Sequence, residues 1–569
     1  MTNPIQDSVQ PWQEIAAKKR QAEQSKIPPE WILPTSVVEG AKHRRSLTGP
    51  FLESLLDPKT SRITAMDVAA LIQHMGSGTL TAVAVVRSFC KRAAMIHQLT
   101  RNMLEIGFDI ALGRAKELDD YFHQHRRLVG PLHGIPMTLK DQFHIKGLET
   151  SMAFVGWIAT FEGLRSTDKE RNFESELVRE FHLLGAVPIG KSPETSNNIL
   201  GYLWNPHNQL LTAGGSSGGE AVMQALRGSA FGIGTDIGGS VSMPASYNGV
   251  FSLKPSTGRI SMKGVAGVGQ GQQVMPVVAG IMGVSIATLR AVLESLLSTE
   301  PWLRDPYAVP LPWREAEEYH ADTHGSLAFG FMEHDGIVTP HPPVQRALKM
   351  VKITLREAGY NLVDWNPPSN RESLEIHGKI ARGDGCVDVW DALQLSGEPE
   401  VPEIDGLFES GLPRKPLSLA EYQDVVIHMK DYRNRYQEYW MSTAEKSGTG
   451  RPVEAFISPV TPTAAHLPKQ FFHAEYTTSI NVLDYPAVVI PVTFVDQNLD
   501  KIDPSFVPLS ETDRINMDAY DPAAYHGAPV AVQLVGQRLG EERLLSLAQI
   551  VVDALDKYKE RAAVVSANK

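Results

Sequence analysis

The sequence contains very little cysteine. Only two cysteines occur among 569 residues, Cys90 and Cys386, so no framework of disulfide bonds supports the fold. Such a chain is typical of a reducing compartment, and we predict that the protein is cytoplasmic.

Long hydrophobic runs and an excess of positive charge are also missing. The most apolar long window, residues 274–289, is short for a membrane span and contains Pro276, Gly280 and Gly283. We therefore predict a buried loop followed by a strand in this window. The net charge is −11, which argues against nucleic acid or an anionic membrane as the main partner.

The sequence does contain an alternation of two kinds of segment. Strand-like stretches lie at 135–140, 231–235, 360–364 and 529–535, and helix-like stretches at 80–96, 173–184, 343–358 and 540–557. This alternation indicates an α/β fold with a largely parallel sheet. Residues 1–60 have the pattern of an N-terminal helical arm, and the length of the chain allows one very large α/β domain or two to four smaller ones. Long surface loops are predicted near 300–318, 397–416 and 497–528.

Residues 185–192, GAVPIGKS, match the spacing of a phosphate-binding loop, but their context does not fit. That motif needs a strand before it and a helix that starts at its lysine. Here a helix-like stretch comes before the motif, residues 186–189 are themselves strand-like, and Pro193 removes a backbone donor. We therefore predict a helix, a glycine turn and a short strand that ends at Lys191.

Residues 214–219, GGSSGG, place two serines among four glycines, as in a turn that presents a side chain for chemistry. The G-x-S-x-G spacing around Ser216 fits the nucleophile elbow of α/β-hydrolases, so an esterase that uses Ser216 is one alternative. Such an elbow needs a strand directly before the serine, and the preceding residues are polar and loop-like. Ser217 and Glu220 have the spacing of a helix capping box, which predicts a structural role for Ser217.

A second glycine-rich turn, GTDIGGS at residues 234–240, ends on Ser240. A lysine can activate a serine if burial keeps its amine neutral. Lys140 is the best candidate, because it follows the apolar stretch IPMTL at a strand end, where a sheet presents side chains to a cleft.

Three stretches together resemble the amidase signature family. They are GPLHGIPMTLKD, TAGGSSGGEAVMQALRG and GIGTDIGGSVSMPASYNGVFSLKPSTGRI. The sequence is most similar to the fungal acetamidase-like branch, and the similarity extends over most of the chain, with a signature core at about residues 130–262. The resemblance implies a single domain over residues 61–569, with a large mixed β-sheet sandwiched between helices.

The resemblance also implies a Ser–cis-Ser–Lys triad. Ser240 is the expected nucleophile, Ser216 the proton relay and Lys140 the base that acts as a neutral amine. The oxyanion hole is expected to consist of the backbone N–H groups of Ile237, Gly238, Gly239 and Ser240. The residues expected to support these two turns are Gly214, Gly215, Ser217 and Asp236. No metal or organic cofactor is expected.

In the implied reaction, the C–N bond of a small linear carboxylic amide is hydrolysed, and the products are an acid and ammonia or an amine. Carbamates and esters are chemically similar to amides and are possible substrates of the same reaction. The expected partner is a small-molecule amide or carbamate, with no nucleic acid and no membrane, and a homo-oligomer is left open. The sequence departs from the family at Ser242, where an arginine with five N–H donors is common, and this leaves the substrate preference open. Two alternatives from other functional classes stay open. The chain could be a catalytically silent subunit of a larger complex, or a membrane-associated lipid amidase.

Overall fold

The fold is organised by an 11-stranded sheet in the order β1-β3-β2-β6-β8-β7-β12-β13-β11-β9-β10. The computed structural model describes residues 11–319, 326–404, 406–470 and 473–567. The strands of this sheet are β1 (Glu105–Ile106), β2 (Pro136–Lys140), β3 (Val187–Ser192), β6 (Phe231–Asp236), β7 (Phe251–Lys254), β8 (Val278–Gly283), β9 (Ala328–Phe331), β10 (Asn361–Asp364), β11 (Ala455–Pro459), β12 (Ala487–Phe494) and β13 (Pro529–Val535). A separate two-stranded sheet consists of β4 (Ser196–Asn197) and β5 (Gly201–Tyr202).

The large sheet is mixed. β2 is parallel to β3 and β6, and β9 is parallel to β10 and β11, whereas the other neighbours are antiparallel. The largely parallel sheet predicted from the alternation is therefore wrong, and the mixed sheet implied by the resemblance is confirmed. Residues 255–277, between β7 and β8, contain no helix, and the chain returns beside β7 in the antiparallel direction.

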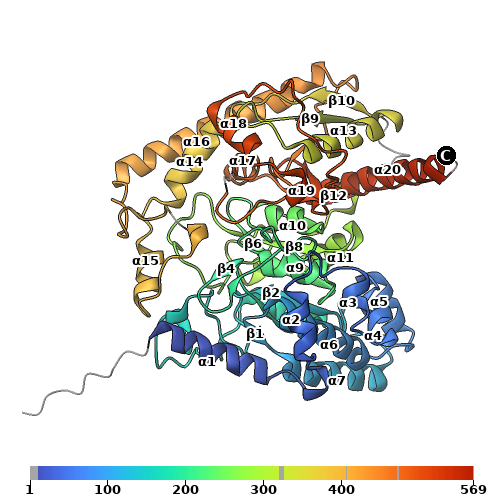
Figure 1. Cartoon of the computed structure of the whole chain (residues 1–569), viewed down its shortest axis with the longest axis vertical. Helices are drawn as coiled ribbons and strands as arrows, with labels where there is room; N and C mark the ends of the chain where they lie inside the picture. The colour runs from blue at the N-terminus through green and yellow to red at the C-terminus, as the bar shows by residue number, and fades with distance from the viewer. Residues whose placement is uncertain (1–10, 320–325, 405, 471–472, 568–569) are drawn as a thin grey trace, which may run out of the picture.

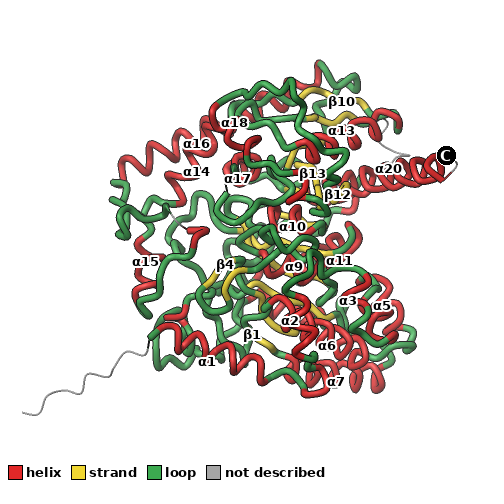
Figure 2. The backbone as a smooth tube through the Cα atoms, viewed as in Figure 1, coloured by secondary structure: helices red, strands yellow, loops and turns green. Residues whose placement is uncertain are grey.

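Helices cover both faces of the sheet, as Figures 1 and 2 show. They are α1 (Trp12–Ser25), α2 (Thr35–Ala41), α3 (Pro50–Glu53), α4 (Pro58–Thr64), α5 (Val68–Gly76), α6 (Ala82–Thr100), α7 (Phe108–His125), α8 (Glu176–Leu184), α9 (Gly218–Ala225), α10 (Ser242–Asn248), α11 (Ile286–Leu297), α13 (Pro342–Glu357), α14 (Asn370–Ala381), α15 (Val387–Gln394), α16 (Leu419–Ser442), α17 (Glu475–Leu483), α18 (Glu511–Asp518), α19 (Pro522–Tyr525) and α20 (Glu541–Ala567). Strands β2, β3, β6, β8 and β13 are buried along their whole length, as expected for strands covered on both faces. Among the described residues, we find no helix with both the length and the apolar character needed to cross a membrane.

Most of the predicted elements are present. The four predicted helices correspond to α6, α8, α13 and α20, and the four predicted strands to β2, β6, β10 and β13. Residues 274–289 begin with a loop and continue as β8, as predicted. The stretch 497–528, predicted as a loop, instead contains α18 and α19. The polar residues that look loop-like there include the helix caps Ser510 and Asp521, whose side chains accept backbone N–H groups of α18 and α19.

The phosphate-loop interpretation of residues 185–192 is excluded by the structure. Helix α8 ends at Leu184, Gly185 follows with a φ of 86°, and β3 begins at Val187. Lys191 lies inside this strand and is buried, so it is not at the start of a helix where a phosphate could be bound.

The N-terminal helices are tied to the sheet by polar and aromatic contacts. Lys19 of α1 is buried and forms ion pairs with Glu105 of β1 and, at 3.0 Å, with Glu149. The ring of Trp31 packs edge-on against Phe108 of α7, with 5.9 Å between the ring centroids. The proposed division of the chain at residue 60 stays a prediction.

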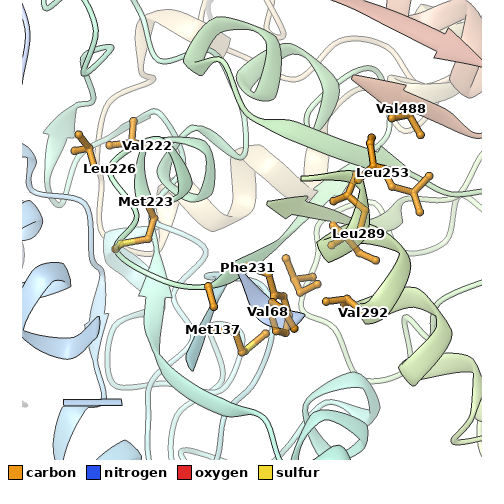
Figure 3. Packing of buried hydrophobic residues seen from close by; sticks show 14 of the residues in the cluster. Val68, Met137, Val222, Met223, Leu226, Phe231, Leu253, Leu289, Val292 and Val488 are labelled. Atoms are coloured by element: carbon orange, nitrogen blue, oxygen red, sulfur yellow. The ribbon is translucent and has the colours of Figure 1, made fainter. Parts of the chain in front are cut away.

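The hydrophobic core fixes the strand ends that carry the site. Figure 3 shows Met137 of β2, Phe231 of β6 and Leu253 of β7 in one buried cluster with Met223 of α9 and Leu289 of α11. Because β2 and β6 are parallel neighbours, their carboxyl ends meet at the same edge of the sheet. This edge holds the polar groups described next.

Candidate active site

Lys140 and Ser216 are joined by a hydrogen bond at the carboxyl end of β2. The Nζ of Lys140 donates to Ser216 Oγ at 2.5 Å and to Thr235 Oγ1 of β6 at 3.1 Å. Thr235 Oγ1 in turn donates to Gln142 Oε1. Lys140 is only 2% exposed, whereas Ser216 is half-buried. The lysine is thus enclosed and held by two hydroxyl groups, of which one can be reached from outside.

Ser217 joins the two serine turns to each other. Its N–H donates to the carbonyl oxygen of Ser240 at 3.1 Å, and its Oγ exchanges hydrogen bonds with the backbone O and N of Thr235, each at 3.2 Å. Within the described residues, Ser217 makes no side-chain cap on α9, and Glu220 accepts from Thr138 Oγ1 at 2.7 Å. The predicted capping box is therefore wrong, because both side chains bond neighbouring strands and hold α9 against β2 and β6.

The glycines of the first turn allow it to pack closely on α10. Gly214 has a φ of 73°, in the left-handed region that glycine favours, and a Cβ there would lie 2.6 Å from Tyr247 Cδ2. The peptide bond between Gly215 and Ser216 is cis, as the resemblance implies. A larger residue at position 214 would push the turn away from α10.

The carboxylate of Asp236 organises the second turn. Its Oδ1 accepts from the Gly239 N–H at 2.7 Å and from Asn481 Nδ2 at 2.9 Å. Its Oδ2 accepts from the N–H groups of Val241 at 2.7 Å and Ser242 at 3.3 Å. Asp236 forms no ion pair within the described part of the chain, so these four donors hold it without the guanidinium that the family commonly has at position 242.

Three of the four N–H groups predicted for the oxyanion hole lack a protein partner. Those of Ile237, Gly238 and Ser240 make no hydrogen bond within the described residues, and all three residues are half-buried. The N–H of Gly239 differs, because Asp236 holds it. Consecutive amides of this kind can bind the oxygen that becomes negative when a carbonyl is attacked.

Two side chains that the sequence analysis missed anchor the carbonyl groups of this turn. His377 Nε2 of α14 contacts the Ile237 oxygen at 2.9 Å, and Thr477 Oγ1 of α17 donates to the Gly238 oxygen at 2.9 Å. A carbonyl oxygen only accepts, so His377 donates through Nε2–H, and burial lowers the pKa of His377. The C=O and N–H of a planar trans peptide point in opposite directions, so His377 turns the Gly238 N–H away from α14.

We expect His377→Leu to lower kcat by about 10- to 10²-fold with little change in KM. Deleting an oxyanion donor outright costs about 10²–10³ in kcat, and a donor that has lost its anchor costs less. His377→Gln keeps a side-chain N–H and should stay close to the unmodified protein. The measurement is kcat and KM for one amide with the Tm of each variant, and an unchanged kcat in a folded His377→Leu protein would contradict this role.

Glu194 is a carboxylate beside Lys140 that the sequence analysis also missed. Its Oε1 lies 3.1 Å from Lys140 Nζ, and its side chain is 32% exposed. It lies in the loop that follows β3, the strand next to β2. In the sequence this glutamate is indistinguishable from an ordinary surface acid, and only the pairing of β2 with β3 brings it to the lysine.

The geometry defines a class of protein. A serine hydroxyl bonded to an enclosed lysine, a second serine in a joined turn and a row of unpaired N–H groups are the parts of a serine hydrolase that works without histidine as its base. The nucleophile elbow considered for Ser216 is excluded, since residues 213–215, directly before it, form no strand.

The chain belongs to the Amidase family, whose family model matches residues 84–545. It is 40% identical over 551 residues to an acetamidase of Aspergillus oryzae and 38% identical over 553 residues to an acetamidase of Emericella nidulans, and each comparison covers 95% of this chain and 98% of the relative. The fold is similar to that of a fatty acid amide hydrolase, with a TM-score of 0.86 and 29% identity over 96% of this chain and 95% of that one. The protein is an amidase, a hydrolase of amide carbon–nitrogen bonds, and the resemblance to the acetamidase-like branch is confirmed.

Proposed function

We propose that the protein hydrolyses small carboxylic amides with Ser240 as nucleophile, Ser216 as proton relay and Lys140 as base. The observation that carries this assignment is the 2.5 Å hydrogen bond between Lys140 and Ser216, in a turn that Ser217 joins to Ser240. The Oγ of Ser240 makes no hydrogen bond within the described residues, and Ser240 is half-buried, so this hydroxyl is available for attack.

The first half of the reaction forms an acyl-enzyme. Ser240 Oγ bonds to the amide carbon while its proton moves to Ser216 Oγ, and the proton of Ser216 moves to the amine of Lys140. The carbonyl oxygen becomes negative and is bound by the N–H groups of the second turn. When the C–N bond breaks, Lys140 returns its proton through Ser216 to the leaving nitrogen.

The second half releases the acid by the same route. Water attacks the ester carbon of the acyl-enzyme, and its proton passes through Ser216 to Lys140. When the bond to Ser240 breaks, the proton returns to Ser240 Oγ, and the carboxylic acid leaves. The proton and bond changes balance over the two halves, so this chain's own residues suffice for each step.

The relatives support a substrate class. Two of them are named acetamidases, which supports a small aliphatic amide, and carbamates and reactive esters share the attacked carbonyl. We propose no nucleic-acid or membrane partner, and the placement in the cytoplasm rests on the scarcity of cysteine.

An activity panel on the purified chain tests this function. Acetamide, longer aliphatic amides, aryl amides and ethyl carbamate are offered separately, and release of ammonia or amine is followed. We expect the highest kcat/KM with a small aliphatic amide. Turnover of none of these compounds would contradict the proposed substrate class and favour a subunit that is silent by itself.

A further inference from the structure

A polar cavity of about 250 Å³ lies beside the Asp236 turn. Its walls come from the end of β7, the start of β8 and the loop between these strands, from α16, from α17 and the residue after it, and from the loop after β13. Neither serine of the proposed triad nor Lys140 lines it, so it is distinct from the site of amide hydrolysis. The charged side chains in its wall are Lys254, Arg433, Arg538 and Asp484.

Three positively charged side chains thus share the wall with a single carboxylate, and both oxygens of that carboxylate already accept hydrogen bonds. Asp484 Oδ1 accepts from the backbone and hydroxyl of Thr257, and its Oδ2 accepts from Arg538 Nε at 2.5 Å. Two further carboxylates act on Lys254 from outside the cavity, those of Asp236 and Glu541. The first is bound by N–H groups, and the second pairs with a buried arginine. With Asp236 counted as negative and Glu541 paired with Arg259, the three cations still exceed the carboxylates around the cavity by one charge.

Most donor groups of these cations have no protein partner. Lys254, 2% exposed, donates once, to the Tyr485 oxygen at 2.7 Å. Arg433 donates once, from Nε to the Val482 oxygen at 2.6 Å. Within the described residues, the other N–H groups of Lys254 and the Nη groups of Arg433 and Arg538 make no hydrogen bond. Burial lowers the pKa of Lys254, and a bound anion would oppose this effect.

Asn481 adds an acceptor to the same wall. Its Nδ2 donates to Asp236, and its Oδ1 is buried without a hydrogen-bond partner within the described residues. A ligand with negative oxygens and one O–H group would satisfy both the cations and this amide oxygen. Hydrogen phosphate has such a set of groups, and an ionised carboxylate has the negative oxygens alone.

We propose that this cavity binds a small oxoanion, of the size of phosphate or a short carboxylate. Guanidinium groups bind the oxygens of carboxylate and phosphate in pairs, with charge-assisted hydrogen bonds. A volume of 250 Å³ accommodates such an ion together with several waters of about 30 Å³ each. A cation is excluded by the charge of the wall. Arg538, whose side chain is 47% exposed, marks the side from which the ion enters.

The test is a titration of the full chain with phosphate, and separately with acetate, at an ionic strength held constant with chloride. Binding is followed by calorimetry and by Tm, because a ligand that binds only the folded state raises Tm as its concentration passes the dissociation constant. Arg433→Gln removes one guanidinium from the wall. Arg435→Gln is the matched control on the same helix, since Arg435 pairs with Glu372 and Asp431 and does not line the cavity.

We expect saturable phosphate binding in the unmodified protein and in Arg435→Gln, and binding weakened about tenfold or more in Arg433→Gln, the usual effect of losing a charged hydrogen bond. Arg538→Gln gives a second test that does not depend on the folding of Arg433→Gln. Acetate binding with the same pattern would identify a carboxylate site, and phosphate alone would identify a phosphate site. Phosphate also stabilises proteins by general exclusion from their surface, so equal responses in all four proteins, or no saturable response, would overturn the proposal.

Discussion

Replacing Ser240 with alanine is expected to lower kcat for an amide by about 10³-fold or more. The nucleophile, relay and base act as one unit, and removing a single member of such a unit costs nearly as much as removing all of them. Because Ser240 is half-buried and its Oγ has no hydrogen-bond partner within the described residues, the substitution should leave the fold and KM almost unchanged. The measurement is steady-state kinetics on the best amide of the panel.

Ser242→Ala is the matched control for this prediction. Ser242 lies two residues further on and is buried, and it contributes its backbone N–H to Asp236, which alanine retains. Its activity should stay close to that of the unmodified protein. If Ser240→Ala kept more than about a tenth of the activity, the assignment of Ser240 as nucleophile would fail, because acyl-enzyme formation through it would then be dispensable.

Replacing Lys140 with methionine should damage amide hydrolysis far more than hydrolysis of a matched aryl ester. Expelling an amine requires a proton on nitrogen, which Lys140 delivers through Ser216 in the mechanism we propose. A phenol has a pKa near ~10, so a phenolate leaves with much less help. General acid catalysis is typically worth about 10²–10⁴-fold, and the gap between the two substrates should be of that size. Methionine is preferred to alanine because Lys140 is only 2% exposed and a shorter side chain would leave a cavity.

The experiment compares kcat/KM for an anilide and an aryl ester that share one acyl group. Lys146→Ala, the loss of an exposed lysine six positions away, provides the control and should affect neither substrate. Equal losses on the two substrates in Lys140→Met would mean that Lys140 serves the attack alone and that another group protonates the leaving nitrogen.

Local patterns in the sequence predict the individual elements well. The apolar run before Lys140 forms β2, and the glycine turn at residue 185 separates α8 from β3 as expected. These elements depend on the hydrophobic periodicity and the turn residues within a short stretch, and both can be read from a single sequence. The resemblance to a family then predicts Lys140, Ser216 and Ser240 as the triad, and in the structure hydrogen bonds join the segments that carry them.

The failed capping box and the two missed side chains, Glu194 and His377, concern contacts between distant segments. The capping box at Ser217 has the correct spacing, but the Ser217 hydroxyl bonds Thr235 of a neighbouring strand, 18 residues away. Glu194 lies next to Lys140 because β3 pairs with β2. His377 contacts the backbone oxygen of Ile237, which is 140 residues earlier in the sequence. Such contacts follow from the packing of the sheet and its helices and have no short-range signal.

The anchors of the second serine turn also determine when, during synthesis of the chain, this turn can be complete. A nascent chain that has reached residue 262 contains every motif by which the family is recognised, yet it lacks His377, Thr477 and Asn481, which lie 140, 239 and 245 residues beyond the groups they bind. While such a chain is still on the ribosome, its Asp236 turn has nothing to hold its carbonyl groups in place. The site therefore has all three anchors in place only after α17 has been synthesised and has docked, and an emerging polypeptide that stops short of α17 carries the Asp236 turn without them.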